Sequence, residues 1–261
     1  MLSRNEIKEI ARLQQKKYRI SEKKILVEGP RLVLEALRSD WHIEKIIMTP
    51  SFRERPLAQV LIGKAKERKS PLYEVPRTEF NRMSDTVHAQ GILGVVKMKE
   101  WEHQPLEMLV QVPKCLFVTI EKLQDPGNLG TIIRTAEWLG ANAVVLGPNC
   151  VEWSNPKTLR ATMGAIFHLP VFELEQFVEF LQEAKKFGAF IYAADLRGDF
   201  PYTTLRYSTK KLLLLGDEVQ GISEECITLA DYKVVIPKRG RIESLNVSIA
   251  AAILMAEMTK N

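Results

Sequence analysis

The sequence predicts an α/β protein with two units, the second of which carries a parallel sheet. Short apolar segments alternate with segments of helical periodicity along the whole chain. In the C-terminal half these apolar segments are almost continuous, as is typical of strands buried on both faces of a parallel sheet. Hydrophobic residues make up 46% and charged residues 26% of the 261 residues, which excludes disordered and fibrous classes.

The first hundred residues predict a small α/β domain. Residues 3–18 have helical periodicity, with Ile7, Ile10 and Leu13 on the apolar face. After them we expect strands at 23–29, 43–50, 71–76 and 91–98, and helices at 30–39, at 56–69 and from Thr78. The stretch 101–113 has no clear period and contains two prolines, so we interpret it as a linker between domains at 1–100 and 114–261.

The sequence of the second domain predicts a parallel sheet. Strands are expected at 115–121, 143–147, 169–172, 189–195, 211–216 and 233–237, and helices at 129–139, 155–165, 174–187, 222–230 and from Ser244. Ligands of such sheets bind at the carboxyl ends of the strands. The loops that follow strands in this half are therefore the candidate site.

The charge of the chain is unevenly distributed. Residues 1–100 hold 21 Lys and Arg against 13 Asp and Glu, a net of +8, whereas the remaining residues have a net of −3 and the whole chain +5. The excess of positive charge in residues 1–100 predicts that the N-terminal part binds a polyanion. We expect phosphate contacts from basic residues there, at Arg4, Lys8, Arg12, Lys16, Lys17 and Arg19. Tyr18 could stack on a base or pack on its helix face.

Several classes of protein and site are not expected. The apolar run Ile249–Ala256 is too short to span a bilayer, and residues 1–17 lack the apolar core of a signal peptide. The three cysteines and four histidines are scattered, so we expect no metal site. A reducing, cytoplasmic location fits this cysteine usage best.

The loop Leu123–Gly130 and the helix after it contain the first unusual residues. Asn128 can cap the helix. Arg134 lies in an apolar stretch near the helix N-terminus, where its charge is unfavourable unless an anion binds. A solvated arginine on a polar helix face is the alternative interpretation.

Two further loops are polar in the same way. In Gly216–Gly221, Asp217 and Glu218 follow a buried strand, where they can meet a ligand or simply begin the next helix. The loop Ile236–Asn246 runs directly into the last helix. Ser244 is a natural helix cap, whereas Asn246 is a poor residue for a first turn and needs another explanation.

These loops resemble a known family. The segments DPGNLGTIIRTAEWLGANAVVL, LLLLGDEVQGIS and VVIPKRGRIESLNVSIAAAILMAE lie in order across 125–257 and resemble the three motifs of the SpoU (TrmH-type) RNA ribose 2′-O-methyltransferases, of the SPOUT superfamily. EGPRLVLEAL is similar to the ribosomal-protein-like substrate-binding domain often attached to them. The resemblance implies a C-terminal trefoil knot, a homodimer whose active site is completed near the partner subunit, and S-adenosylmethionine as cofactor.

The resemblance also implies roles for particular residues. It places catalytic residues at Arg134, Glu218, Asn246 and Asn128, and cofactor contacts at Gly216, Ile236, Pro237, Ser244 and Leu245. In the family the arginine is proposed to be a base or to lower the pKa of the hydroxyl. Because guanidinium stays protonated in proteins, we expect Arg134 to hold a phosphate and stabilise an alkoxide, oriented by Glu218.

The expected substrate is RNA, and ribosomal RNA is favoured by the attached N-terminal domain. A transfer-RNA ribose methyltransferase and a catalytically silent RNA-binding protein are the alternatives. Arg239 and Arg241 give the third loop a basic surface that could contact RNA or remain solvated.

Overall fold

A computed structural model describes residues 2–260, which form two compact units. The first unit comprises the described residues up to Glu100 together with Ser154–His168. The second comprises Trp101–Trp153 and the described residues from Leu169 onward. We expected 154–168 within the second domain, so this segment is a correction to the domain assignment.

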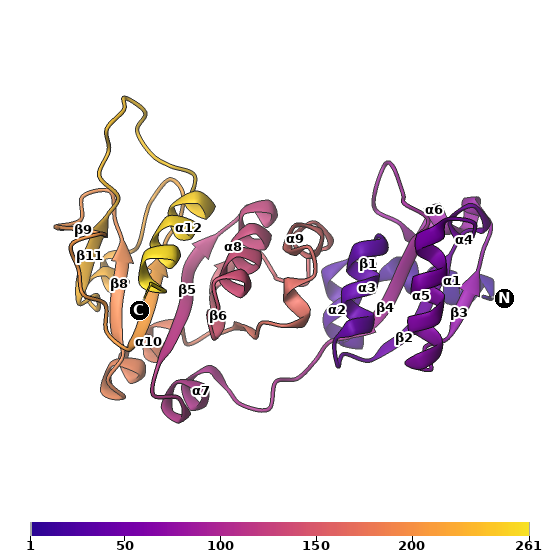
Figure 1. Ribbon diagram of the computed structural model, residues 1–261, viewed down its shortest axis with the longest axis horizontal. Coiled ribbons are helices and arrows are strands. Elements are labelled where there is room, and N and C mark those ends of the chain that lie inside the picture. The colour runs from indigo at the N-terminus through magenta and orange to yellow at the C-terminus, as the bar shows by residue number, and fades with distance from the viewer. Residues whose placement is uncertain (1, 261) are drawn as a thin grey trace. The chain divides into compact units, whose positions relative to one another are not determined.

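The first unit is built on a mixed four-stranded sheet with the order β1-β4-β2-β3 (Figure 1). β4 (Ile92–Lys97) runs antiparallel to β1 (Lys24–Glu28) and β2 (Ile43–Met48), and β3 (Leu72–Glu74) runs parallel to β2. Its helices in the first hundred residues are α1 (Arg4–Arg12), α2 (Lys16–Glu22), α3 (Pro30–Arg38), α4 (Pro50–Arg53), α5 (Pro56–Glu67) and α6 (Arg77–Met83). α1 and α6 pack in one apolar cluster against the sheet.

The helix expected over 3–18 is interrupted, and the buried side chain of Arg19 accounts for the break. Its Nη1 donates to the carbonyl oxygens of Leu13 (3.1 Å) and Gln14 (2.6 Å), where α1 has ended. Arg19 is only 2% exposed, and its Nε also donates to Ser154 Oγ at 3.4 Å. The prediction that Arg19 contacts RNA is therefore wrong, because this arginine satisfies backbone groups inside the unit.

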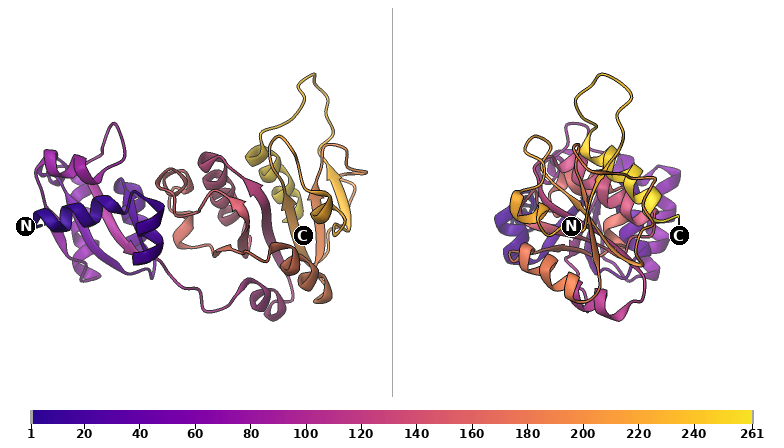
Figure 2. Two further views of the ribbon diagram at one scale, coloured as in Figure 1. Left: turned by 180° about the vertical axis from the view of Figure 1, so that it is seen from behind. Right: turned by 90° about the vertical axis from the view of Figure 1, so that its left-hand side faces the viewer.

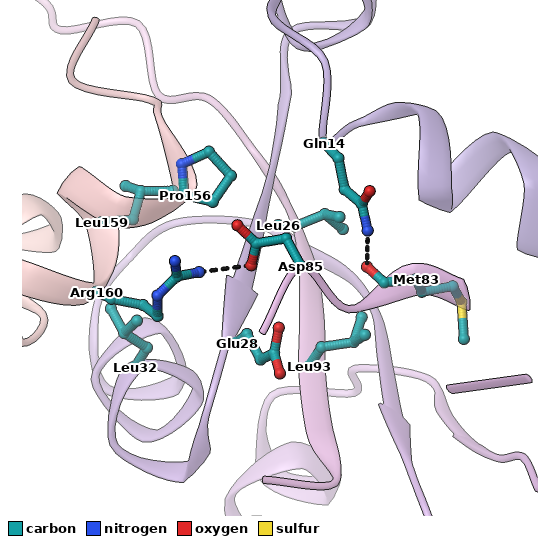
Figure 3. Close-up of a pocket in the computed structure, with 10 residues that line it drawn as sticks. All are labelled: Gln14, Leu26, Glu28, Leu32, Met83, Asp85, Leu93, Pro156, Leu159 and Arg160. Atoms are coloured by element: carbon teal, nitrogen blue, oxygen red, sulfur yellow. Dashed lines mark hydrogen bonds and ion pairs between the residues drawn. The ribbon is translucent and has the colours of Figure 1, made fainter. Parts of the chain in front are cut away.

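The segment 154–168 forms α9 (Pro156–Thr162) and a short 3₁₀ helix, η1 (Ala165–Phe167), instead of one helix over 155–165. Met163 and Gly164 both have positive φ and end α9. Figure 3 shows Pro156 and Leu159 beside residues of β1 and α3, with Arg160 aimed at Asp85. The Arg160 Nη1 to Asp85 Oδ1 distance is 2.6 Å, and the cavity there is only about 10 Å³. The segment is thus closely packed into the first unit.

The second unit contains a seven-stranded sheet with the order β7-β6-β5-β10-β8-β11-β9. All pairings between its named strands are parallel, which confirms the predicted sheet. The strands are β5 (Cys115–Leu123), β6 (Ala143–Cys150), β7 (Val171–Glu173), β8 (Phe190–Ala194), β9 (Phe200–Pro201), β10 (Lys210–Leu215) and β11 (Tyr232–Val235). The two-residue β9 was not expected.

Helices cover both faces of this sheet. α8 (Pro126–Trp138) and α12 (Val247–Met258) pack together on one face, as Figure 1 shows. α7 (Pro105–Gln111), α10 (Phe177–Lys186) and α11 (Glu224–Ile227) contribute to the apolar cluster on the other. α7 lies where we expected an irregular linker, and its Leu109 is fully buried.

Within the described part of the chain, no helix is both long and apolar enough to cross a membrane. The trefoil knot expected at the C-terminus stays a prediction.

Replacing Arg19 by methionine should lower the free energy of unfolding by about 2 kcal/mol, because a buried and a partly buried carbonyl oxygen lose their donor. Urea unfolding followed by circular dichroism measures the change. Lys8→Met is the matched control, since Lys8 is exposed on α1 and should change stability by less than about 0.5 kcal/mol. Equal stability of the two variants would contradict a structural role for Arg19.

Candidate active site

The three unusual loops all begin at carboxyl ends of strands in the parallel sheet. α8 follows β5 after a two-residue connection, the loop Gly216–Ser223 follows β10, and the loop Ile236–Asn246 follows β11. β5 and β10 are neighbours, so their ends meet at one edge of the sheet. Figures 1 and 2 show the third loop extending away from the strands before the chain returns as α12.

Three of the four expected catalytic residues form one hydrogen-bonded chain. Asn246 Nδ2 donates to Asn128 Oδ1 at 3.0 Å. Asn128 Nδ2 donates in turn to Glu218 Oε1. Side chains from all three loops are therefore connected, although they lie far apart in the sequence.

Both helix caps differ from the expected ones. Asp125 caps α8, because its Oδ1 accepts from the backbone N of Asn128 at 2.7 Å. Asn246 caps α12 through Oδ1, which accepts from the backbone N of Ser248 at 2.9 Å. The predictions of caps at Asn128 and Ser244 were wrong. The amide group of Asn128 is consequently available to the other two loops.

Arg134 lies on α8, six residues after Asn128, and is exposed. It makes no hydrogen bond or ion pair with any residue that the structure describes. Glu218, which we expected to orient it, is bonded to Asn128 instead. In the single chain Arg134 is thus an uncompensated positive charge available to an external anion.

The second loop is hydrogen-bonded to itself and to the end of β5. Asp217 Oδ1 accepts from the backbone N of Val219 and of Gln220, each at 2.9 Å, and these bonds lower the pKa of Asp217. Lys122 Nζ donates to Gln220 Oε1 at 3.1 Å and lies 3.6 Å from Asp217 Oδ2. Lys122 directly precedes the first loop and was not among the residues predicted from the sequence.

A cavity of about 500 Å³ lies between the second and third loops. All five residues expected to contact a cofactor line it, namely Gly216, Ile236, Pro237, Ser244 and Leu245. Its volume is typical of sites for small organic ligands. Asp195 and Arg197, at the end of β8, also line the cavity and were not singled out from the sequence.

Gly216 gives this cavity its shape at the end of β10. A Cβ atom at this position would collide with the backbone of Gly221 and Ile222. The chain can therefore fold back on itself here only because residue 216 has no side chain. The same close approach leaves backbone groups at the cavity wall.

The expected RNA-binding residues are exposed, apart from Arg19; they are Arg4, Lys8, Arg12, Lys16 and Lys17 in the first unit and Arg239 and Arg241 in the third loop. Tyr18 packs against the apolar cluster of α1 and α6, with the guanidinium of Arg12 5.6 Å from its ring centroid. Tyr18 is therefore explained as a packing residue of the first unit, the second of the two interpretations offered by the sequence. Among residues 2–260, no group of three or more His, Cys, Asp or Glu side chains is placed to hold a metal ion.

Known proteins resemble both parts of the chain. Residues 115–256 match the SpoU rRNA Methylase family, and residues 4–94 match the MRM3-like substrate binding domain. The chain is 34% identical over 249 residues to the 23S rRNA (guanosine(2553)-2′-O)-methyltransferase RlmP of Bacillus subtilis, covering 95% of this chain and 94% of the relative.

Solved structures resemble the fold over almost the whole chain. A TrmH-family protein from Porphyromonas gingivalis has a TM-score of 0.85 and 32% identity, covering 99% of this chain and 98% of its own. An rRNA methyltransferase from Sinorhizobium meliloti, solved with AdoMet bound, has a TM-score of 0.82 and 29% identity, covering 99% and 95%.

Gly216→Ala should lower the free energy of unfolding by about 1–3 kcal/mol, because the added methyl group meets backbone that cannot easily move. Gly240→Ala is the matched control: its Cβ would lie in open space on the third loop. Urea unfolding of both variants measures the difference. A Gly216→Ala variant as stable as Gly240→Ala would show that the loop tolerates a side chain there.

Proposed function

The chain belongs to the SpoU rRNA methylase family, and on that premise we propose that it transfers a methyl group from S-adenosylmethionine to a ribose 2′-hydroxyl of ribosomal RNA. The observation that carries the proposal is the hydrogen-bonded chain of Asn246, Asn128 and Glu218 beside a ligand-sized cavity. The assignment to ribosomal RNA is supported by the name of the Bacillus subtilis relative.

The cavity fits S-adenosylmethionine in size and in chemistry. Its walls combine apolar side chains such as Ile236 and Leu245 with polar backbone at Gly216, which suits a nucleoside with a charged tail. Gly216, Ile236, Pro237, Ser244 and Leu245 would hold the cofactor. When bound, it supplies an electrophilic methyl group on a sulfonium.

The polar residues beside the cavity would position the ribose. Asn246 and Asn128 are fixed by the bonds between the loops, and each keeps one amide hydrogen that is preorganised to donate to a ribose oxygen. Arg134 would bind the adjacent phosphate and stabilise the developing alkoxide, while the hydroxyl proton passes to water and S-adenosylhomocysteine leaves as the new O–CH3 bond forms. Its permanent charge suits stabilisation of an anion better than acceptance of a proton.

The first unit would dock the RNA. Arg4, Lys8 and Arg12 are four residues apart, so they share one exposed face of α1, and Lys16 and Lys17 begin α2. Such a row of cations binds phosphates without reading sequence. Arg239 and Arg241, on the exposed third loop, would provide a second contact beside the reaction site.

A second copy of the chain would cover α8 and α12. Trp138 is 84% exposed on α8, and Ile249 is 50% exposed on α12, a helix made mostly of apolar residues. Arg134 lies one turn before Trp138 on the same face. A dimer formed through this face would place Arg134 in the interface, where the partner's loops could complete its surroundings.

We also place the protein in the cytoplasm. Its three cysteines are free, with Cys115 and Cys226 buried, as suits a reducing compartment where RNA is available.

The substrate is tested by mapping 2′-O-methylation in RNA from cells with and without the gene. Loss of one methyl group in ribosomal RNA is the expected result. Loss from transfer RNA would assign the alternative substrate, and no loss together with no binding of S-adenosylmethionine in calorimetry would identify a silent RNA-binding protein.

Arg134→Ala should reduce methylation at least about hundredfold, because stabilisation of the anion is lost, while cofactor affinity changes little. Incorporation of labelled methyl groups into RNA and calorimetry with S-adenosylhomocysteine measure the two effects. Arg206→Ala, another exposed arginine of the second unit, is the control and should retain activity. Equal loss of binding and methylation would indicate a structural role for Arg134.

Arg134→Lys should keep part of the activity, without full recovery at high pH. Lysine retains the positive charge but lacks the planar guanidinium group that donates two hydrogen bonds to a phosphate. The measurement is the pH–rate profile from neutral to alkaline pH. Full recovery at high pH would favour a proton-accepting residue over the electrostatic role.

Trp138→Glu should convert a dimer into a monomer, because a charge would be buried in the proposed interface. Sedimentation equilibrium measures the mass. Glu137→Ala, on the neighbouring position of α8, is the control and should sediment as the wild type does. A monomeric wild-type protein would contradict the proposed dimer.

A further inference from the structure

Asp195 directly follows β8 and lines the cavity between the second and third loops. β8 lies between β10 and β11 in the sheet, and the loops after those two strands form the cavity walls. Asp195 is therefore placed centrally at the edge of the sheet where the ligand is expected.

The backbone around Asp195 is held in place. Its N donates to the carbonyl of Val234 at 3.0 Å, and its own carbonyl accepts from Gly198 N at 3.1 Å. The side-chain Oδ1 accepts from Arg197 N at 2.7 Å. A Cβ at residue 198 would meet the backbone of β11, so the turn packs directly on that strand. The carboxylate is thus preorganised before any ligand binds.

One oxygen of this carboxylate has unused capacity. No described residue donates a hydrogen bond to Oδ2, although the side chain is only 22% exposed. The nearest cation, Arg197 Nε, lies 4.0 Å from Oδ1 on a side chain that is 91% exposed, so the pair contributes little. Asp217 and Glu218, by contrast, already accept hydrogen bonds within the site.

Asp195 is separate from the hydrogen-bonded trio. Asn128 lies in the first turn of α8, and Glu218 and Asn246 belong to the loops after β10 and β11. Asp195 instead follows β8 and bonds to its own turn and to β11. The methyl group must face the trio, so we assign the carboxylate of Asp195 to another part of the cofactor. A carboxylate at the end of a parallel strand is well suited to accept hydrogen bonds from ribose hydroxyls.

We propose that Asp195 binds the ribose hydroxyls of S-adenosylmethionine, an inference that rests on the proposed function. The carboxylate accepts from the vicinal 2′- and 3′-hydroxyls and fixes the nucleoside in the cavity. Asp195 is then a binding residue for the cofactor and has no part in moving the proton of the RNA hydroxyl.

Calorimetry with three probes tests this assignment. Asp195→Ala should lower the affinity for both S-adenosylhomocysteine and 5′-methylthioadenosine about tenfold, because both compounds carry the ribose diol. Binding of 2′,3′-dideoxy-S-adenosylhomocysteine should be the same for wild type and variant. Asp195→Asn keeps the oxygen that accepts from Arg197 N, so it preserves the turn and should give a smaller loss for the same two probes.

Asp199→Ala is the matched control, since this exposed carboxylate lies four residues later and outside the cavity lining. It should bind all three probes as the wild type does. If Asp195→Ala lowers the affinity for S-adenosylhomocysteine alone, Asp195 lies at the amino-acid part of the cofactor and the proposal is overturned. Unchanged affinity, or an equal loss of affinity for all three probes, would also overturn it. Wild-type protein that binds none of the probes would instead overturn the proposed function.

Discussion

The side chain of Asn246 connects the last helix of the protein to the other two loops of the site. Its Oδ1 caps α12 by accepting from the backbone N of Ser248, and its Nδ2 donates to Asn128. Because one amide group serves both purposes, the start of α12 cannot move without disturbing Asn128 and, through it, Glu218. The position of the helix and the geometry of the site are thus set by the same bonds.

The parallel sheet explains why residues so far apart in sequence meet at this point. All three loops leave the sheet at carboxyl ends of strands, and β10 is inserted between β5 and β8, so late and early segments become neighbours. Gly216 then lets the second loop fold tightly against itself at the wall of the cavity. Polar side chains at the rim and backbone in the walls follow from that arrangement.

The sequence predicted the parallel sheet and the three loops, because buried strands and polar loops leave strong local signals. The caps were mistaken at Asn128 and Ser244, since several residues near each helix start can cap it and only the backbone path selects Asp125 and Asn246. Asp195 went unnoticed because a single aspartate after a strand has no distinctive pattern. Its significance comes from the cavity, which is a tertiary feature.

The charge of the first unit also depends on the tertiary fold, which the sequence pattern alone did not predict. The segment 154–168 contains Lys157 and Arg160 and no acidic residue, so the first compact unit has a net charge of +10 and the second −5. The asymmetry is greater than the division at residue 100 suggested. Arg19 is nevertheless buried, and Arg160 pairs with Asp85, so both charges are engaged by groups of the first unit, although Arg160 is still partly exposed. The cations proposed to contact RNA on α1, at the start of α2 and on the third loop are exposed. Salt should therefore weaken the proposed RNA binding by screening these exposed residues. The net charge alone does not indicate which residues those are.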